Sequence, residues 1–286
     1  MCCTFTKSVM SKTRIYVGEA ERNGETVHVL AYQNAAKTTG PNAMVLPFPT
    51  HTAMGPENVI DTRKFKNFLK DITEASRQIT KGFSADGMQR RGMTLGAKSV
   101  AQVFNVGSYT VVLADNVKQI PEALERVPAD RRPTVSKNFL KGYGTLYPKD
   151  PIAVCCWNGS IEAEPLMWWY VPRDRTELFI PTMDAHDGEA PVRGMEVSTD
   201  HIISVGSVGP TNGYEVRYTE DLPQTVRDLL PSHVHGHKLP HYMENGDCFV
   251  KTSDLHQDTK VAYFRGGSKS VILERGDYAH RMDGWS

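Results

Sequence analysis

The chain has 286 residues, of which 40% are hydrophobic and 23% charged, and its 33 Lys and Arg residues balance 33 Asp and Glu residues. This composition excludes an intrinsically disordered chain, which would have fewer apolar residues and a larger net charge. A net charge of zero also argues against binding to nucleic acid, because such proteins neutralise phosphates with a local excess of Lys and Arg. The length predicts one compact unit over residues 1–286, or two related halves, about 1–150 and 151–286.

The N-terminus, Met-Cys-Cys-Thr-Phe-Thr-Lys, has neither the apolar run of a membrane helix nor the pattern of a signal peptide. We therefore expect a cytoplasmic protein without membrane contacts. The five cysteines are odd in number and include two adjacent pairs, so free thiols are expected at Cys2, Cys3, Cys155, Cys156 and Cys248.

The first predicted element is a β-hairpin. Two runs rich in Thr, Val, Ile and Tyr, 13–17 and 26–33, are separated by a stretch that contains Asn23-Gly24. Asn and Gly tolerate the positive φ that a tight reversal requires. A short apolar run at 43–46, stopped by Pro47, predicts a further strand, either buried or at a sheet edge.

The strongest helical pattern lies between Asp61 and Gly82. Apolar residues recur there at helical spacing, with Asp61 or Thr62 placed to cap the start and Gly82 the end. We expect one amphipathic helix that lays its apolar face on a sheet. That face would consist of Phe65, Phe68, Leu69, Ile72 and Ile79.

The rest of the chain predicts three short helices and many strands. The helices are expected at 121–127, 136–141 and 223–230, with Pro121 and Pro223 in first-turn positions. Helices are too few to cover both faces of a parallel sheet, so the sequence predicts an α+β fold of mostly antiparallel sheets with a few segregated helices. The further strands are expected at 100–106, 109–113, 152–157, 166–171, 177–180, 201–208, 214–218, 248–251, 261–264 and 271–274.

Cys2 is the first candidate for chemistry. Removal of the initiator Met would leave Cys2 with a free α-amine, whose pKa near 8 lets it act as base for its own thiol. This is the layout of N-terminal-nucleophile amidohydrolases. The alternative is that Cys2 and Cys3 are small buried side chains that fix the N-terminus in a sheet.

The second candidate is a group of four histidines, His233, His235, His237 and His241. In an extended segment the first three fall on one side, where neutral imidazoles can bind Zn or a similar transition metal. The alternative is a solvated loop, which Gly236 and Pro240 favour because they break extended geometry. We expect the loop, and therefore no cofactor, with a transition metal such as Zn as the alternative.

The third candidate follows the strand predicted to end at Ile180 and consists of Asp184, His186 and Asp187. Carboxylate and imidazole groups at the end of a strand can bind a metal or act as acid and base. The alternative is a turn in which Asp side chains bond to their own backbone and Gly188 supplies the reversal.

Several segments resemble a family of uncharacterised bacterial proteins that begin Met-Cys-Cys or Met-Cys-Trp. The resemblance covers about the first two-thirds of the chain and rests on Thr-Arg-Ile-Tyr at 13–16, Ala-Tyr-Gln at 31–33, Asn-Ala-Met-Val-Leu-Pro-Phe-Pro at 42–49, Val-Gly-Ser-Tyr at 106–109 and Phe-Ile-Pro-Thr-Met-Asp-Ala-His-Asp-Gly at 179–188. It implies one continuous unit to about residue 205 and no particular activity. Asp184 stands where the family has His, which weakens a metal site around His186.

Two functions follow as expectations. The favoured one is a β-rich, non-enzymatic binding or assembly protein, because the sequence contains no complete catalytic constellation. Its partner would be another protein or a second copy of the chain, not nucleic acid or a membrane. The alternative is an amide or acyl hydrolase with Cys2 as nucleophile.

Overall fold

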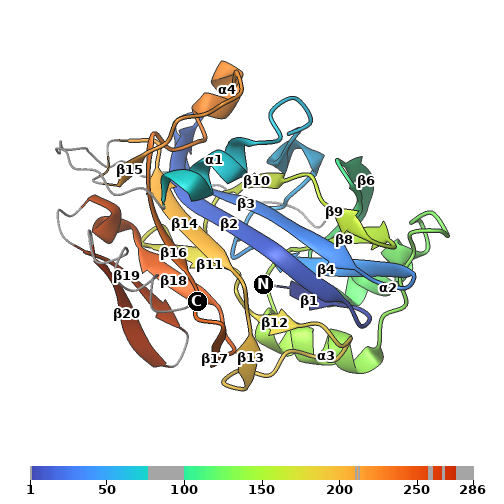
Figure 1. Ribbon diagram of the computed structural model, residues 1–286. Helices are drawn as coiled ribbons and strands as arrows, with labels where there is room; N and C mark the ends of the chain where they lie inside the picture. Colours follow the sequence, from blue (N-terminus) through green and yellow to red (C-terminus); the bar gives the residue numbers. More distant parts are fainter. Residues whose placement is uncertain are drawn as a thin grey trace.

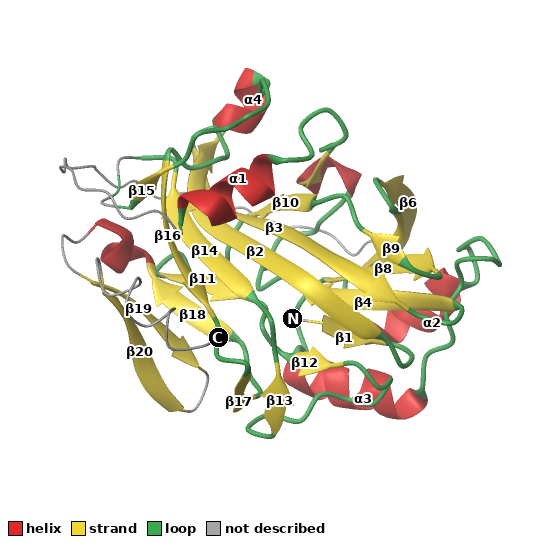
Figure 2. Cartoon of the chain, in the orientation of Figure 1, coloured by secondary structure: helices red, strands yellow, loops and turns green. Residues whose placement is uncertain are grey.

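The structure is a computed structural model, and it describes residues 2–76, 100–209, 211, 213–256, 260–265 and 268–274. β-Sheet is the main regular structure of the described chain, with a few short helices around it (Figure 1, Figure 2). Strand pairs are antiparallel except for β1 with β12 and β2 with β14. The predicted α+β fold of mostly antiparallel sheets is therefore confirmed.

Four sheets contain the strands. The six-stranded sheet has the order β12 (Asp184–Ala185), β1 (Cys2–Thr4), β4 (Pro41–Pro47), β8 (Ile152–Asn158), β7 (Tyr109–Ala114) and β6 (Gln102–Val106). The eight-stranded sheet has the order β15 (Tyr214–Glu215), β16 (His233–Lys238), β14 (Ile202–Ser207), β2 (Val9–Arg22), β3 (Glu25–Lys37), β10 (Leu166–Tyr170) and β5 (Val59–Ile60), with β9 (Ile161–Glu162) beside β3. The four-stranded sheet contains β11 (Glu177–Ile180), β18 (Cys248–Lys251), β19 (Lys260–Arg265) and β20 (Ser268–Glu274), and the two-stranded sheet contains β13 (Glu196–Ser198) and β17 (Tyr242–Glu244).

The helices are short. They are α1 (Phe68–Ala75), α2 (Ile120–Leu124), α3 (Lys137–Leu146) and α4 (Gln224–Arg227), with 3₁₀ turns η1 (Pro56–Asn58), η2 (Val117–Gln119) and η3 (Thr252–His256). Ser136 caps α3, because its Oγ accepts a hydrogen bond from the Phe139 N–H at 2.9 Å. No helix in the described part of the chain is long and apolar enough to cross a membrane.

The hairpin predicted at Asn23-Gly24 is confirmed. Arg22 of β2 pairs with Glu25 of β3, so the turn between them has two residues. Both have positive φ, 54° at Asn23 and 76° at Gly24, as a two-residue hairpin turn of type I′ requires. This hairpin supplies the two longest strands of the eight-stranded sheet.

The amphipathic helix is shorter at its start than predicted. α1 begins at Phe68, while Asp61 bonds with Arg63 through its carboxylate and forms a local turn before the helix. An Asp that binds the backbone two residues ahead stabilises a turn in place of a helix cap. The expected apolar face is confirmed for Phe65, Phe68, Leu69 and Ile72, which are all buried. Ile79 and Gly82 lie outside the described residues.

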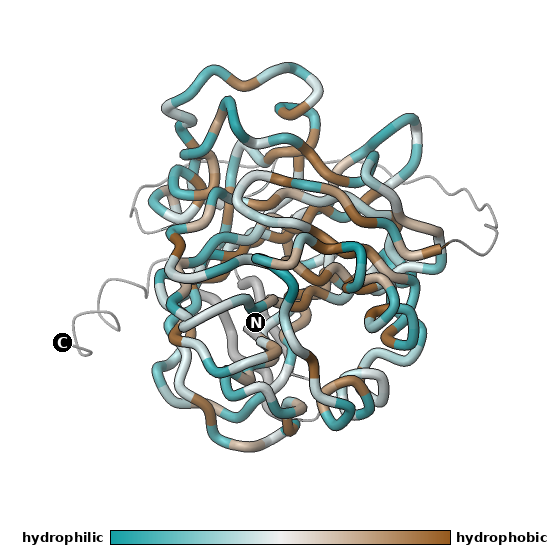
Figure 3. The backbone as a smooth tube through the Cα atoms, turned by 90° about the vertical axis from the view of Figure 1, so that its right-hand side faces the viewer, coloured by the Kyte–Doolittle hydropathy of each residue, from teal (hydrophilic) through white to brown (hydrophobic). Residues whose placement is uncertain are grey.

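Two hydrophobic cores lie on opposite faces of the eight-stranded sheet. The smaller core lies beneath α1 and α4 and includes Tyr16, Phe68 and Leu229. The larger core joins the eight-stranded, six-stranded and four-stranded sheets and includes residues from both halves of the chain, such as Leu30 and Leu178. Figure 3 shows hydrophobic segments among the central strands and hydrophilic segments in many of the outer loops.

Four of the five cysteine side chains are described, and none of these four forms a disulfide, as predicted. Cys3, Cys155, Cys156 and Cys248 are unbridged and buried. Burial raises the pKa of Cys155 well above its ordinary range and that of Cys156 to about 12. These thiols are therefore poor nucleophiles at neutral pH, since the thiolate is the reactive form.

Candidate functional site

The N-terminal strand lies beside the segment that contains the third sequence candidate. The backbone of β1 pairs in parallel with β12, which places Cys2 opposite Asp184 and Cys3 opposite Ala185. The Cys3 thiol is buried, and its Sγ lies 3.5 Å from the Met183 carbonyl oxygen. Two candidates that are far apart in the sequence are therefore neighbours in the fold.

A buried carboxylate between two imidazoles forms the centre of this region. Asp184 Oδ1 lies 3.0 Å from His186 Nε2, and Asp184 Oδ2 lies 4.0 Å from His201 Nε2. The side chains of Asp184 and His201 are 4% and 2% exposed, whereas that of His186 is 31% exposed. Only His186 could therefore exchange protons directly with a molecule in solution.

The two imidazoles hold Asp184 in its ionised form. Burial raises the pKa of Asp184, but the charge interaction with His201 and the hydrogen bond with His186 outweigh burial and lower this pKa to about 2. The lowered pKa means that the carboxylate stabilises the fold above the ordinary pKa of 3.8. That contribution is lost as the pH falls towards 2.

Asp187 does not join this centre. Its side chain is exposed, and its Oδ1 accepts a hydrogen bond from the Glu189 N–H at 3.0 Å. Gly188 has a φ of 88°, and a Cβ there would lie 2.8 Å from the Phe5 carbonyl oxygen. The structure thus brings Asp184 and His186 together and gives Asp187 the turn role that was its alternative.

Asn245 makes two hydrogen bonds with the backbone of Asp184. Its Oδ1 accepts a hydrogen bond from the Asp184 N–H at 2.8 Å, and its Nδ2 donates to the Asp184 carbonyl at 2.7 Å. Asn245 is 2% exposed, so both bonds are sheltered from water. One side chain therefore fixes the position of β12.

Asp247 fixes the residues that precede β12. Its Oδ1 accepts from the N–H groups of Thr182 and Met183 at 3.0 and 3.1 Å, and its Oδ2 accepts from the Tyr147 hydroxyl at 2.5 Å. Burial raises the pKa of Asp247, although these bonds oppose the shift. We call Asp184, His186, His201, Asn245 and Asp247 the polar cluster.

No pattern in the sequence marked His201, Asn245 or the structural role of Asp247. They approach Asp184 through pairings between distant segments, and no local spacing marks such pairings. The Asn245-Gly246-Asp247 sequence signals only a turn.

The histidine-rich segment is a strand, so the predicted loop is wrong. β16 includes His233, His235 and His237 on one face, with Val234 buried on the other. Along a strand the first and last of these lie roughly 13 Å apart, which is too far for one ion to bind both. His241 lies beyond β16, where its carbonyl oxygen accepts a hydrogen bond from the Thr199 N–H. Within the described ranges no group of three or more His, Cys, Asp or Glu residues could hold a metal ion.

The strands β13 and β17 form a two-stranded ribbon at the lower edge of Figure 1. We call residues 192–199 and 241–245 the ribbon. Its exposed apolar side chains are Val192 at 56%, Met195 at 52% and Tyr242 at 64% exposure. The Tyr242 ring packs edge-on against His241, with centroids 4.5 Å apart. Apart from their pairing with each other, β13 and β17 pair with no strand of the described chain.

The ribbon is joined to the polar cluster through Asn245 and Thr199. The backbone N–H of Asn245 donates to the Met195 carbonyl at 2.7 Å, while the Asn245 side chain is hydrogen-bonded to the Asp184 backbone. On the other side, Thr199 receives a hydrogen bond from the His201 N–H at 3.2 Å and donates its own N–H to the His241 carbonyl at 2.8 Å. The polar cluster therefore sets the position of the ribbon on the body of the protein.

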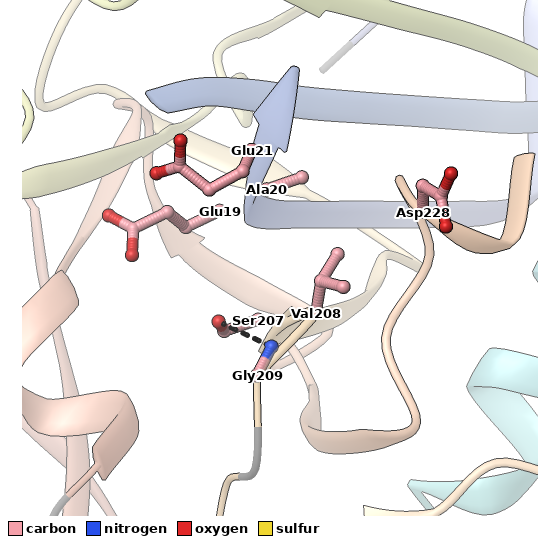
Figure 4. Close-up of a pocket in the computed structure, with 7 residues that line it drawn as sticks. All are labelled: Glu19, Ala20, Glu21, Ser207, Val208, Gly209 and Asp228. Carbon is pink, nitrogen blue, oxygen red and sulfur yellow. Dashed lines mark hydrogen bonds between the residues drawn. The ribbon is translucent and has the colours of Figure 1, made fainter. Parts of the chain in front are cut away.

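A surface hollow of about 340 Å³ lies elsewhere, between β2 and the end of β14. Figure 4 shows Glu19 and Glu21 on one side of it and Asp228 on the other, with the Gly209 N–H bonded to Ser207 Oγ at 3.2 Å. The hollow is lined by few polar groups apart from these carboxylates. It lacks the convergent polar groups of a ligand site.

No family model matches this chain, and no curated protein matches it in sequence. The resemblance to the bacterial family therefore stays a prediction. Among solved structures the chain is similar to the crystal structure of baculovirus P35, with 14% identity and a TM-score of 0.43, over 96% of this chain and 99% of that chain. At this identity and TM-score, the likeness is too distant to indicate a shared activity or partner.

Proposed function

We propose that this protein is a non-enzymatic assembly module that associates with a second copy of itself through the ribbon. One observation carries the proposal. Five large apolar side chains are exposed among the residues whose burial the structure describes, and three of them, namely Val192, Met195 and Tyr242, lie on the ribbon. Single exposed apolar residues are common on protein surfaces, but their collection on one protruding element is typical of an interaction site.

The geometry of the ribbon supports a second copy as the partner. An edge strand offers backbone N–H and C=O groups to another strand, and strand addition is a common mode of protein recognition. If the same edge of two copies pairs about a two-fold axis, the interface is self-complementary. The assembly then stops at a dimer. The zero net charge of the chain gives no long-range repulsion between copies.

The anchoring of the ribbon also supports binding. A two-stranded ribbon is only marginally stable by itself in water. Here Asn245 and Thr199 hold it to the polar cluster, so less conformational entropy is lost when it binds.

Serine substitutions in the ribbon are expected to weaken association. Tyr242→Ser and Met195→Ser should each raise the dimer dissociation constant at least about tenfold, or ~1.4 kcal/mol, because buried aromatic and Met side chains dominate interface energies. Sedimentation velocity over roughly 1 to 100 µM measures this constant. Val9→Ser is the matched control, since Val9 is 65% exposed and lies outside the ribbon. A protein that stays monomeric throughout, or a control that weakens association equally, would contradict the proposal.

A second candidate function is favoured by the register of β1 and β12. The backbone of Cys2 lies opposite Asp184, and Asp184 lies 3.0 Å from His186. A thiol, an imidazole base and an orienting carboxylate are the parts of a nucleophilic centre for amide or acyl hydrolysis. Under this candidate Cys2 is the nucleophile, His186 the base and Asp184 the group that orients the imidazole.

The reactivity of Cys2 separates the two candidates. If Cys2 is a nucleophile, brief iodoacetamide treatment should alkylate it far faster than the buried Cys3, Cys155, Cys156 and Cys248. Its rate should also fall about tenfold or more in His186→Ala, because the base is removed. Intact and peptide mass spectrometry measure both rates, with His51→Ala as the control for an exposed histidine. Equal rates in the protein and in His186→Ala would exclude the hydrolase.

A further inference from the structure

A fully buried histidine on β3 has no part in the ribbon or the polar cluster. His28 is 0% exposed and lies opposite Tyr170 of β10, with ring centroids 5.8 Å apart at 77°. Within the described chain, neither ring nitrogen of His28 nor the hydroxyl of Tyr170 has a hydrogen-bond partner. A buried imidazole in this state is tolerated when neutral and is far more costly when charged.

A charged segment lies against this pair. Residues 171–176 follow β10 directly and contain Arg173, Asp174 and Arg175. Arg175 forms an ion pair with Glu25 at the start of β3, at 3.3 Å. Arg173 bonds with the Asp150 carboxylate and with the Thr50 carbonyl oxygen. Arg175 therefore ties the segment to the eight-stranded sheet, and Arg173 ties it to residues that flank β4 and β8 of the six-stranded sheet.

The same segment connects two sheets. It leads from β10 of the eight-stranded sheet into β11, the edge strand of the four-stranded sheet. The Thr252 N–H donates to the Thr176 carbonyl at 2.9 Å, which ties the end of the segment to β18 and η3. Movement of residues 171–176 would therefore act on the junction between these two sheets.

We infer that His28 makes the contact between the β3–β10 pair and residues 171–176 sensitive to acid, and we call this contact the joint. Protonation of His28 opens the joint. The four-stranded sheet is then held less firmly to the eight-stranded sheet. The opening needs no ligand, because water that enters the junction solvates the imidazolium. This device is independent of ribbon-mediated assembly.

The charged and titratable surroundings agree with a neutral histidine at pH 7. Burial lowers the pKa of His28 from 6.5 to about 3, while Asp174 opposes this shift and Arg175 adds to it. The titratable and charged groups around this position are Glu19 of β2 in its register, Tyr170 of β10, and Asp174 and Arg175 of the segment, and Glu25 is paired with Arg175. Asp150 affects this position only through Tyr170, because its charge raises the pKa of the Tyr170 hydroxyl.

The sign of the pH dependence follows from the lowered pKa. An open joint regains the ordinary histidine pKa near 6.5, so it takes up a proton at a higher pH than the closed joint does. The stabilisation by neutral His28 is complete above pH 6.5 and is lost progressively as the pH falls towards 3. From pH 7 to pH 5 the equilibrium constant for opening should rise roughly 25-fold.

Hydrogen exchange tests the joint locally. After correction for intrinsic exchange rates, peptides that cover residues 171–180 should lose protection roughly 25-fold between pH 7 and pH 5, while β8 in the six-stranded sheet should not. His28→Phe should abolish the change, because Phe keeps the ring contact with Tyr170 but does not titrate. His241→Gln, which alters an exposed histidine, should keep it.

Three outcomes would overturn the inference. One is unchanged protection of 171–180 at pH 5, another is an undiminished change in His28→Phe, and the third is simultaneous loss of protection in all peptides, which would indicate global unfolding. If His28→Phe does not fold, NMR titration of His28 in the unaltered protein replaces it. A ring that titrates near 6.5 while residues 171–180 stay protected would also contradict the joint.

Discussion

Replacement of Phe68 by Ala is expected to lower the free energy of unfolding by about 3 to 5 kcal/mol. Phe68 is 0% exposed and lies in the core between α1 and the eight-stranded sheet, where its ring packs edge-on against Phe65 at 5.8 Å. Truncation removes the buried ring and leaves a cavity in a core that has few other residues to fill it. Urea denaturation followed by circular dichroism measures the change.

Lys70→Ala is the matched control within α1. Lys70 is exposed and forms an ion pair with Glu74 at 3.7 Å. Exposed pairs at this spacing contribute about 0.3 to 0.5 kcal/mol, so the control should change stability by a few tenths. A loss below about 1 kcal/mol in Phe68→Ala would show that the α1 face is not packed on the sheet as described.

Replacement of Asn245 by Ala is expected to lower the free energy of unfolding by about 2 to 6 kcal/mol. The substitution removes both hydrogen bonds to the Asp184 backbone and leaves two buried polar groups without their partners. Each such group carries a desolvation cost of about 1 to 3 kcal/mol. Since Asn245 also joins the ribbon to the polar cluster, association should weaken under conditions in which the variant is still folded.

Asn116→Ala is the control for Asn245→Ala. It removes a side-chain hydrogen bond outside the ribbon, so it shows whether the weaker association is specific to Asn245. Asn116, which lies outside the ribbon, caps η2 by accepting a hydrogen bond from the Lys118 N–H at 3.0 Å. Its replacement should cost about 1 kcal/mol and leave association unchanged. If Asn245→Ala associates as strongly as the unaltered protein, the polar cluster does not position the ribbon.

The parts of the fold that sequence reasoning predicted are those specified by neighbouring residues. Asn23-Gly24 accepts the two positive φ values of a hairpin turn, and Ser136 offers an oxygen to the first turn of α3. The apolar spacing of Phe68, Leu69 and Ile72 predicted the buried face of α1. In each case a physical preference within a few residues decides the structure.

The histidine-rich segment shows why local preference can mislead. Gly236 favours a loop in isolation, yet in β16 it lies where a Cβ would collide with Ser76 at the end of α1. The glycine there permits close approach of the helix to the strand and does not make a turn. Only the packing of α1 on the sheet reveals this.

The polar cluster was only partly predictable for a related reason. Asp184 and His186 are close in sequence, so their pairing could be proposed from spacing. The contacts with His201 and Asn245 depend on sheet registers that join distant segments. A register is set by the complete pattern of buried side chains, and no single motif records it.

Amide hydrogen exchange of the unaltered protein, below and above the concentration at which it associates, tests assembly through the ribbon most directly. We expect protection to rise at high concentration in β13 and β17 and to stay unchanged in β6, which is also an edge strand. Backbone amides of the ribbon would then be sheltered by the second copy. Unchanged exchange in the ribbon at all concentrations, or new protection confined to other strands, would contradict assembly through the ribbon.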